Sequence, residues 1–440
     1  MNLTDKNALV FGIGRSGRAA ARLLAHEGAN VTIWDSAPRE KIESIIEATA
    51  NEGFPCLAGD AWQKDETSYD LAVLSPGIEP TSEAVRKVTK QGTPLFAEIE
   101  LAARFNQAPI AAITGTNGKT TTTLLLESLL RAANIRSTAC GNIGKPFSEV
   151  VLASPHDQII TLEVSSFQLE TIHEFHPKVA IWTNFSANHL DRYKSIEEYR
   201  EAKERIFKNQ TSSDFAILNI REPQPDIPSQ ILTFSADSSN ADLSFTGNEV
   251  RFQNRSIAKV TNPRLLGFHN RENLLAAIGA CIGLGVEPTS LIPALDNFAP
   301  PEHRCEHVGT FSGITVINDS KSTNLDASEK AIRSFAPPII LILGGKNKGF
   351  DFAPLSPLIH QCVKHTIAIG EMRSSIAETL AHKNCSEADD LEHAIQLARK
   401  LASSGDTVLF SPGTSSFDMF ANYEARGKAF KELIPNYFLS

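Results

Sequence analysis

The residues best suited to chemistry lie in a short glycine-containing loop about one quarter of the way along the chain. An apolar stretch leads into Gly115, Gly118 and Lys119, and a Thr-Leu-rich segment follows. Glycines let backbone N–H groups turn toward phosphate oxygens, the lysine can reach terminal phosphates, and Thr120 is placed to coordinate Mg²⁺. The pattern predicts a loop that holds a nucleoside triphosphate, although Ile113 stands where the full motif has its first glycine.

A second glycine loop lies near the N-terminus. Gly12, Gly14 and Gly17 follow an apolar strand and open a helix, and Asp35 ends the next strand. This spacing is typical of a diphosphate at a helix N-terminus, with an acid for a ribose hydroxyl. Alone it indicates a nicotinamide-dependent oxidoreductase, or glycines with a purely structural role. Together the two loops suggest a nucleotide-linked substrate that is activated by ATP.

Composition limits the classes of protein to consider. The 440 residues are 42% hydrophobic and 21% charged, with a formal net charge of −9 and no cluster of Lys and Arg. We therefore expect no nucleic-acid partner. No apolar run reaches the roughly 18 to 20 residues that a membrane span needs, and no signal-peptide pattern is found, so we expect a cytoplasmic protein. The six cysteines lack a C-x-x-C pair, which favours reduced thiols over zinc or disulfides.

Short apolar strands alternate with amphipathic segments throughout, which predicts an α/β fold with parallel sheets. Among the expected strands are 179–182 and 407–410, and the polar stretch 235–261 is expected to form surface strands and loops. The length and the Pro/Gly-marked breaks predict three domains. These are an N-terminal Rossmann-like domain, a central domain with a parallel sheet and the phosphate loop, and a Rossmann-like C-terminal domain, at residues 1–96, 97–301 and 302–440.

Four further stretches accompany the phosphate loop. They are Gly-Asn-Ile-Gly at 141–144, Leu-Glu-Val-Ser-Ser-Phe-Gln-Leu at 162–169, Asn-His-Leu-Asp-Arg at 188–192 and His-Asn-Arg-Glu-Asn at 269–273. Together they resemble the Mur ligases, ATP-dependent amide-forming enzymes that add amino acids to the cytoplasmic peptidoglycan precursor. The resemblance covers essentially the whole chain in order.

The last part of the chain narrows this resemblance. His-Arg at 303–304, Asn-Asp-Ser-Lys-Ser-Thr-Asn at 318–324 and Gly-Gly-Lys-Asn-Lys-Gly at 344–349 are similar to the members that join D-glutamate to UDP-N-acetylmuramoyl-L-alanine. Those members usually have Ala where this chain has Ser322. The resemblance implies a monomeric enzyme that uses ATP and Mg²⁺, forms an acyl phosphate, and releases ADP and phosphate.

The resemblance also implies an ATP and metal site. The catalytic residues would be Lys119, Glu163, His189 and Lys203. Thr120, Glu163, His189 and Lys203 would hold Mg²⁺. ATP would contact Gly115, Thr116, Asn117, Gly118, Lys119, Thr120, Thr121, Asn270, Asn273, Arg304 and Asp319. The alternatives are a structural carboxylate at Glu163 and an ordinary loop histidine at His189. Since Arg304 lies near the start of the third domain, domain closure around ATP is expected, with 300–301 as a possible hinge.

Lys203 carries the most unusual implication. In the family the matching lysine reacts with CO₂, and the carbamate binds metal. This requires a neutral amine, which burial or nearby positive charge can provide by lowering the lysine pKa. The alternative is a solvated lysine on a helix, because the surrounding residues 199–207 are helix-forming.

Two substrate sites complete the expectation. The UDP-linked substrate would lie against Gly14, Arg15, Ser16, Asp35, Ser36, Gly77 and Asn142, with 75–77 closing the pocket. D-Glutamate would lie against Lys321, Thr323, Lys348, Ser416 and Tyr423, since two lysines near hydroxyl donors suit a dianion. The sequence departs from the commoner pattern at Tyr423, where Phe is usual, and at 413–415, where Ala-Cys-Ala is common.

Three alternatives stay open at this point. Another amino-acid ligase of the family, or a related folylpolyglutamate synthase, would share the ATP machinery and differ in the end domains. An NAD-dependent oxidoreductase would leave Lys119 and Glu163 unexplained. A non-enzymatic phosphate-loop switch would hydrolyse ATP slowly, without dependence on an acceptor.

Overall fold

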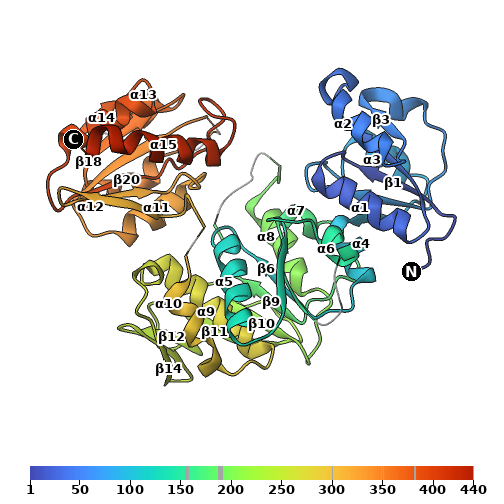
Figure 1. Ribbon diagram of the computed structural model, residues 1–440, viewed down its shortest axis with the longest axis horizontal. Helices are drawn as coiled ribbons and strands as arrows, with labels where there is room; N and C mark the ends of the chain where they lie inside the picture. Colours follow the sequence, from blue (N-terminus) through green and yellow to red (C-terminus); the bar gives the residue numbers. More distant parts are fainter. Residues whose placement is uncertain are drawn as a thin grey trace. The chain divides into compact units, whose positions relative to one another are not determined.

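The computed structural model describes residues 1–153, 158–186, 192–299, 301–347, 349, 351–380 and 383–439. Within these residues the strands form three sheets, mainly parallel, with helices between most successive strands (Figure 1). Parallel neighbours need a crossover connection, and the helices supply it, so the α/β class is confirmed. The chain forms two compact units, one with the first two sheets and one with the third.

The first sheet has the strand order β3-β2-β1-β4-β5, all parallel. Its strands are β1 (Asn7–Phe11), β2 (Asn30–Asp35), β3 (Cys56–Ala58), β4 (Leu71–Leu74) and β5 (Leu95–Ala97). The helices between them are α1 (Arg15–His26), α2 (Arg39–Asn51) and α3 (Glu83–Thr89). The order reverses at β1, so the carboxyl ends of β1, β2 and β4 form the edge where such sheets bind ligands.

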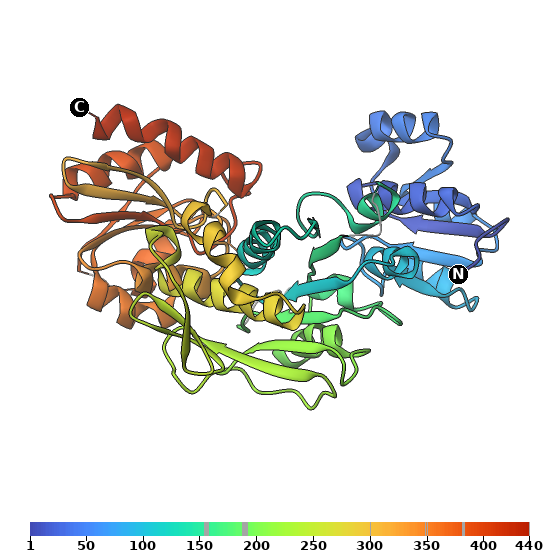
Figure 2. The same ribbon diagram turned by 60° about the horizontal axis from the view of Figure 1, so that its bottom comes forward.

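The second sheet has the order β14-β13-β12-β11-β10-β9-β6-β8-β7. Its strands are β6 (Ile110–Thr114), β7 (Ser137–Gly141), β8 (Ile159–Glu163), β9 (Val179–Trp182), β10 (Phe215–Asn219), β11 (Gln230–Ser235), β12 (Leu243–Thr246), β13 (Glu249–Phe252) and β14 (Arg255–Lys259). Its helices are α4 (Glu98–Phe105), α5 (Lys119–Ala132), α6 (Phe147–Ala153), α7 (Ser166–Leu169), α8 (Ile196–Glu204), α9 (Phe268–Gly283) and α10 (Ile292–Asn297). Figure 2 shows the yellow-green antiparallel strands β12 to β14, which continue this sheet. They confirm the strands expected in the polar stretch.

The third sheet has the order β15-β16-β20-β17-β18-β19, antiparallel at β15 and parallel elsewhere. Its strands are β15 (Glu306–Phe311), β16 (Ile314–Asn318), β17 (Ile339–Gly344), β18 (Val363–Ile369), β19 (Cys385–Glu387) and β20 (Thr407–Phe410). Its helices are α11 (Leu325–Ser334), α12 (Ser356–Cys362), α13 (Arg373–Leu380), α14 (Leu391–Leu401) and α15 (Tyr423–Phe438). Apolar clusters lie on both faces of this sheet, as expected for a parallel sheet covered by helices.

The first and second sheets are joined without a spacer. β5 ends at Ala97 and α4 begins at Glu98. Glu100 on α4 is buried, and its carboxylate accepts hydrogen bonds from the backbone N–H groups of His173, Glu174 and Phe175. One apolar cluster includes side chains of both sheets, so the two share a core. The predicted boundaries at 96/97 and 301/302 stay a prediction.

No helix in the described part of the chain is both long and apolar enough to cross a membrane.

Candidate active site

The phosphate loop connects β6 to α5 and depends on two glycines. Gly115 has a φ of +138°, and Gly118 has a φ of +86°. A Cβ atom would lie 2.0 Å from Thr183 Oγ1 at Gly115, and 2.3 Å from Asn273 Oδ1 at Gly118. Other residues would therefore be strained and would also clash at these two positions.

Two polar residues after β9 hold the loop in place. Asn184 accepts hydrogen bonds from the backbone N–H of Thr116 through its carbonyl, at 2.9 Å, and from that of Asn117 through Oδ1, also at 2.9 Å. Thr183 Oγ1 donates to the Asn117 carbonyl at 2.6 Å. β9 lies beside β6 in the sheet, so its end necessarily lies beside the loop. Sequence reasoning missed this pair, although polar residues directly after an apolar strand were a usable signal.

Two lysines meet at one carbonyl oxygen of the loop. Lys119 Nζ donates to the Gly115 carbonyl at 2.8 Å and to the Thr116 carbonyl at 2.9 Å. Lys203 Nζ, from α8, donates to the same Gly115 carbonyl at 2.9 Å. The site thus brings two lysine amines together at the loop that would hold phosphate.

Lys203 is not the solvated lysine that its helix alone would suggest. Lys203 is only 2% exposed, and its Nζ lies 4.7 Å from the centre of the Tyr199 ring. Tyr199 belongs to an aromatic group with Tyr193, Phe167 and Phe185. Burial, and then the charge of Lys119, lower the pKa of Lys203 well below its usual value. This shift favours the neutral amine that the sequence interpretation required.

Glu163 ends β8 and is buried at 2% exposure. Its position is fixed by register, because it pairs with Ile113 of β6 and Gly141 of β7. Oε1 accepts a hydrogen bond from Asn142 Nδ2 at 2.9 Å, whereas Oε2 is inaccessible and has no hydrogen-bond partner among the described residues. A buried carboxylate oxygen without a partner is costly, so this atom fits a cation ligand.

The oxygen atoms near the loop suit a Mg²⁺ ion that is coordinated by the protein and by the phosphates of ATP together. Glu163 and the half-buried Thr120 carry hard oxygen atoms that would suit such an ion. Within the described ranges there is no group of three His, Cys, Asp or Glu side chains that could form an all-protein metal site. Mg²⁺ commonly uses one or two protein oxygens, with substrate phosphates and waters completing its coordination. His189, the other expected ligand, lies outside the described residues.

The N-terminal glycine loop lies at the carboxyl edge of the first sheet. Gly12 has a φ of +101°, and a Cβ at Gly17 would lie 1.8 Å from the Gly12 carbonyl oxygen, so both glycines are needed for packing. Around Gly14 there is open space. Asp35 accepts hydrogen bonds from the N–H groups of Ile13 and Ala37, each at 2.9 Å. The expected residues Arg15, Ser16, Ser36 and Gly77 lie along the same edge and are exposed or half-buried.

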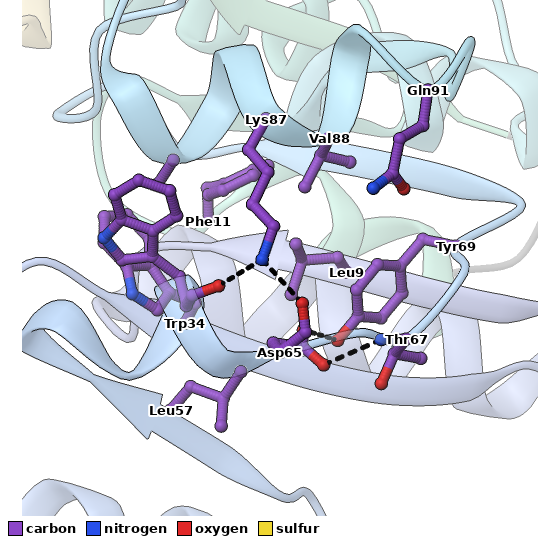
Figure 3. A pocket seen from close by; sticks show the side chains of 12 residues that line it. Leu9, Phe11, Trp34, Leu57, Asp65, Thr67, Tyr69, Lys87, Val88 and Gln91 are labelled. Atoms are coloured by element: carbon purple, nitrogen blue, oxygen red, sulfur yellow. Dashed lines mark hydrogen bonds between the residues drawn. The ribbon is translucent and has the colours of Figure 1, made fainter.

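A second pocket, next to the first sheet, is too small to be an alternative nucleotide site. Figure 3 shows Lys87 extending into it from α3. Lys87 Nζ donates to the carbonyls of Trp62, Gln63 and Asp65 at 2.8, 3.1 and 2.6 Å. The remaining cavity of about 10 Å³ has room for about one water. It is therefore packed interior and not a nucleotide site.

The expected residues of the last domain lie in loops after strands of the third sheet and at the start of α15. Asp319 follows β16, and its carboxylate accepts from Cys305 N at 3.1 Å and from Ser411 Oγ at 2.7 Å. Burial raises the pKa of Asp319 to about 6. Lys321 Nζ lies 3.6 Å from the centre of the Tyr423 ring. Ser416 is buried, Thr323 is half-buried, and Lys348 lies outside the described residues.

Helix α9 carries the two expected asparagines, and Arg304 precedes β15. Asn270 Nδ2 donates to the Arg264 carbonyl at 2.8 Å. Asn273 Oδ1 accepts from Thr122 Oγ1 at 3.3 Å, beside Gly118. Arg304 lies between His303 and Cys305, whose φ values are +65° and +46°. Both neighbours therefore have the left-handed backbone conformation, which is uncommon for residues other than glycine.

Three family models match successive parts of this chain. They are the Mur ligase MurD-like N-terminal domain at residues 6–97, the Mur ligase middle domain at 113–281 and the Mur ligase glutamate ligase domain at 303–413. The chain belongs to the Mur ligase family. Its expected membership, α/β fold and ATP-dependent amide-forming ligase class are thereby confirmed.

Individual Mur ligases extend this comparison. Proteins named UDP-N-acetylmuramoylalanine--D-glutamate ligase from Alkaliphilus metalliredigens and Koribacter versatilis are 38% and 39% identical, and each alignment covers 99% of this chain and 99% or 98% of the relative. The solved UDP-N-acetylmuramate-alanine ligase of Thermotoga maritima has a TM-score of 0.60 at 18% identity, over 98% of this chain and 99% of that one. The MurF ligase of Thermotoga maritima in complex with ADP has a TM-score of 0.62 at 15% identity, over 99% and 96%. These structures share the three-domain fold.

Proposed function

We propose that this Mur ligase joins D-glutamate to UDP-N-acetylmuramoyl-L-alanine and cleaves ATP to ADP and phosphate, in peptidoglycan precursor synthesis. The observation that carries the proposal is the full-length similarity, at 38% to 39% identity, to relatives named for that reaction. The two lysines at Gly115 and the unpartnered oxygen of Glu163 support the ATP-dependent step.

The chemistry proceeds in two displacements. The carboxylate of the alanyl group attacks the γ-phosphorus of ATP, which forms an acyl phosphate and releases ADP. The amine of D-glutamate then attacks the acyl carbon, and the tetrahedral intermediate expels phosphate as the amine loses its proton. Both steps gather negative charge, so stabilisation comes mainly from cations, backbone donors and positioning.

The phosphate loop is suited to the first displacement. The left-handed Gly115 and Gly118 shape a turn at the start of α5, where backbone N–H groups can face phosphates. Lys119 would exchange its two carbonyl acceptors for phosphate oxygens. When bound to Thr120 and Glu163, Mg²⁺ would supply Lewis-acid stabilisation of the phosphate charge.

We further infer that Lys203 forms a carbamate. Its neutral amine would attack CO₂, forming an N–C bond and releasing one proton. The product is an anion, which would attract the charged Lys119 and add a metal ligand. His189 is proposed as a ligand of a second Mg²⁺ from the family resemblance alone.

The other ATP and substrate contacts are also proposed from the family resemblance. ATP would also use Asn270, Asn273, Arg304 and Asp319, and the two substrate sites would use the residues expected from the sequence. The proposed setting is the cytoplasm, where ATP and a nucleotide-linked substrate are available, and the proposed state is a monomer. Size-exclusion chromatography with light scattering tests the latter.

The deciding experiment measures phosphate release with ATP, Mg²⁺ and UDP-N-acetylmuramoyl-L-alanine. D-Glutamate is compared with L-glutamate, L-alanine, L-lysine and diaminopimelate. Turnover that requires D-glutamate supports the proposal. Turnover with another amino acid would keep the ATP site and overturn the substrate assignment, while ATP hydrolysis without dependence on any acceptor would favour a non-ligase role.

A further inference from the structure

Arg426 is the largest side chain among the fully buried residues described. It lies in the first turn of α15 and has 0% exposure. A positive charge is unfavourable near a helix N-terminus, and removing an arginine from water is expensive. The fold must therefore compensate this residue through its contacts.

Arg426 hydrogen-bonds to two loops that follow neighbouring strands. Nη2 donates to the Ser320 carbonyl at 2.8 Å and to the Thr414 carbonyl at 3.1 Å, and Nε donates to Ser320 Oγ at 3.1 Å. Ser320 directly precedes Lys321 in the loop after β16, and Thr414 lies two residues before Ser416 in the loop after β20. The guanidinium thus ties together the two loops that carry most of the proposed D-glutamate contacts.

A third loop, after β17, also lies next to the Arg426 guanidinium. A Cβ at Gly345 would lie 3.2 Å from Arg426 Nη1, so the glycine lets this backbone approach the arginine. Thr414 Oγ1 donates to the Lys346 carbonyl at 2.5 Å, and Lys346 N donates to the Ser415 carbonyl at 3.0 Å. Since β16, β20 and β17 are adjacent, Arg426 lies under the central carboxyl edge of the sheet.

The positive charge of Arg426 is not balanced by a close carboxylate. No ion pair within 4 Å involves Arg426 among the described residues, and its Nη1 is buried there without a hydrogen-bond partner. Asp418 and Asp319 act on it only from longer range. Burial lowers the pKa of Arg426 to about 10, so the group is still charged at neutral pH. The protein therefore keeps an unpaired cation beneath the proposed amino-acid site.

We propose that Arg426 is a positioning residue of the amino-acid site, which fixes the loops bearing Lys321, Thr323 and Ser416 and favours a dianionic amino acid through its unpaired charge. This inference rests on the proposed function. Arg426 acts through the Ser320 and Thr414 carbonyls and through its field, and it does not touch the reacting atoms. In a low-dielectric interior such a field is weakly screened.

The experiment compares Arg426→Met, Arg426→Lys and Ser320→Ala with wild type and with Arg333→Met. Arg333 is exposed on α11 of the same unit and pairs with Glu329, so its replacement removes the same charge from the surface. Phosphate release gives kcat and a KM for each substrate, and thermal unfolding reports the fold. We expect Arg426→Met to raise the KM for D-glutamate at least tenfold and the KM for ATP less than twofold.

The other variants separate charge from loop support. Arg426→Lys keeps the charge but loses the two-pronged donor, so an intermediate KM for D-glutamate is expected. Ser320→Ala removes the Nε contact and the hydrogen bond from Ser320 Oγ to the Tyr423 carbonyl, but keeps the contact of Arg426 with the Ser320 carbonyl. A two- to fivefold rise is expected for it, and Arg333→Met should match wild type. If Arg426→Met does not fold, the Arg426→Lys and Ser320→Ala values decide the question.

Two results would overturn the inference. One is an unchanged KM for D-glutamate in Arg426→Lys and Ser320→Ala, or in a folded Arg426→Met, while wild type requires D-glutamate; the proposed function then stands. The other is turnover of the wild-type enzyme with an amino acid that has a single carboxylate. That result would contradict the proposed function, and it would also remove the reason for a positive charge beneath the site. Equal rises in all KM values would indicate a merely structural arginine and would also count against it.

Discussion

The two glycine loops of the first unit share a backbone design but differ in the charges around them. Each follows a parallel strand, contains a left-handed glycine and opens a helix. At the N-terminal loop, the carboxylate of Asp35 accepts the Ile13 N–H. At the central loop, Lys119 and Lys203 both donate to the Gly115 carbonyl, and Glu163 ends a neighbouring strand.

The difference separates holding a nucleotide from reacting with one. Glycine spacing sets the backbone for phosphate in both loops. At the central loop, Lys119 and Lys203 can meet phosphate charge, and Glu163 at the end of the neighbouring strand β8 can hold a cation. At the N-terminal loop the described side-chain contact is instead with Asp35. The N-terminal loop should therefore affect substrate affinity, and the central loop should affect turnover.

The strongest test of this contrast is Lys203→Met. It removes the proposed carbamate and one of the two loop lysines, so we expect kcat to fall at least about 1,000-fold, equivalent to roughly 4 kcal/mol. Because Lys203 is buried and uncharged methionine fits an apolar wall, the fold should be retained. Phosphate release and circular dichroism check both statements. Near-normal turnover of Lys203→Met would remove the carbamate from the proposal.

Glu163→Gln should have the next largest effect. The amide keeps the shape and can still accept from Asn142, but it weakens the cation ligand, so kcat should fall about 100- to 1,000-fold. The measurement is phosphate release across a Mg²⁺ series. Asp35→Asn is the matched variant at the N-terminal loop, where a change in the KM of the UDP-linked substrate and a near-normal kcat are expected. Similar loss of kcat in both variants would break the comparison.

Gly14→Ala sharpens the contrast at a smaller scale. A Cβ at Gly14 meets no protein atom within 4 Å, so the melting temperature should stay close to wild type. If the substrate diphosphate approaches this backbone, its KM should rise about tenfold, or about 1.4 kcal/mol. Gly115→Ala is the counterpart, because its Cβ would clash and its φ is +138°, and we expect it to lose more than about 1 kcal/mol of stability. An unchanged KM in Gly14→Ala would place the diphosphate elsewhere.

The pH dependence of stability should show the smallest effect. The pKa of Lys203 is lowered in the folded protein, so between that pKa and the unfolded value near 10.5 the unfolded chain binds more protons. Its contribution to the free energy of unfolding therefore increases as pH rises through this window. Lys203→Met has no such titrating group and avoids the cost of burying a charged amine, so it should be more stable than wild type near pH 7. This difference in the free energy of unfolding should shrink from pH 7 toward pH 10. Denaturant unfolding in CO₂-free buffer measures it, and a pH-independent difference would contradict the lowered pKa.

Much of the fold could be predicted because the relevant signals are local. Strands β9 and β20 have the bounds expected from their apolar runs, and the antiparallel strands of the polar stretch were also expected. The phosphate loop and the strand-end position of Glu163 follow from neighbouring residues. Local patterns do not show which distant residues support them.

The missed parts of the site depend on contacts between distant segments. The support of Asn117 by Thr183 and Asn184 arises because β9 lies beside β6, a pairing that sequence spacing does not give. Arg426 looks like an ordinary charged helix residue in the sequence, and only the folded loops make it fully buried. The roles of His189 and Lys348 stay predictions.

The direct join between β5 and α4 has a consequence for engineering. Ala97 ends a strand of one sheet, Glu98 starts a helix that packs with the next, and Glu100 is fastened to the backbone at 173–175. Residues 1–97 are thus not a cassette that can be exchanged by cutting at the strand end. A chimera that takes its nucleotide specificity from another Mur ligase would have to bring α4 and the matching side of the shared core with it.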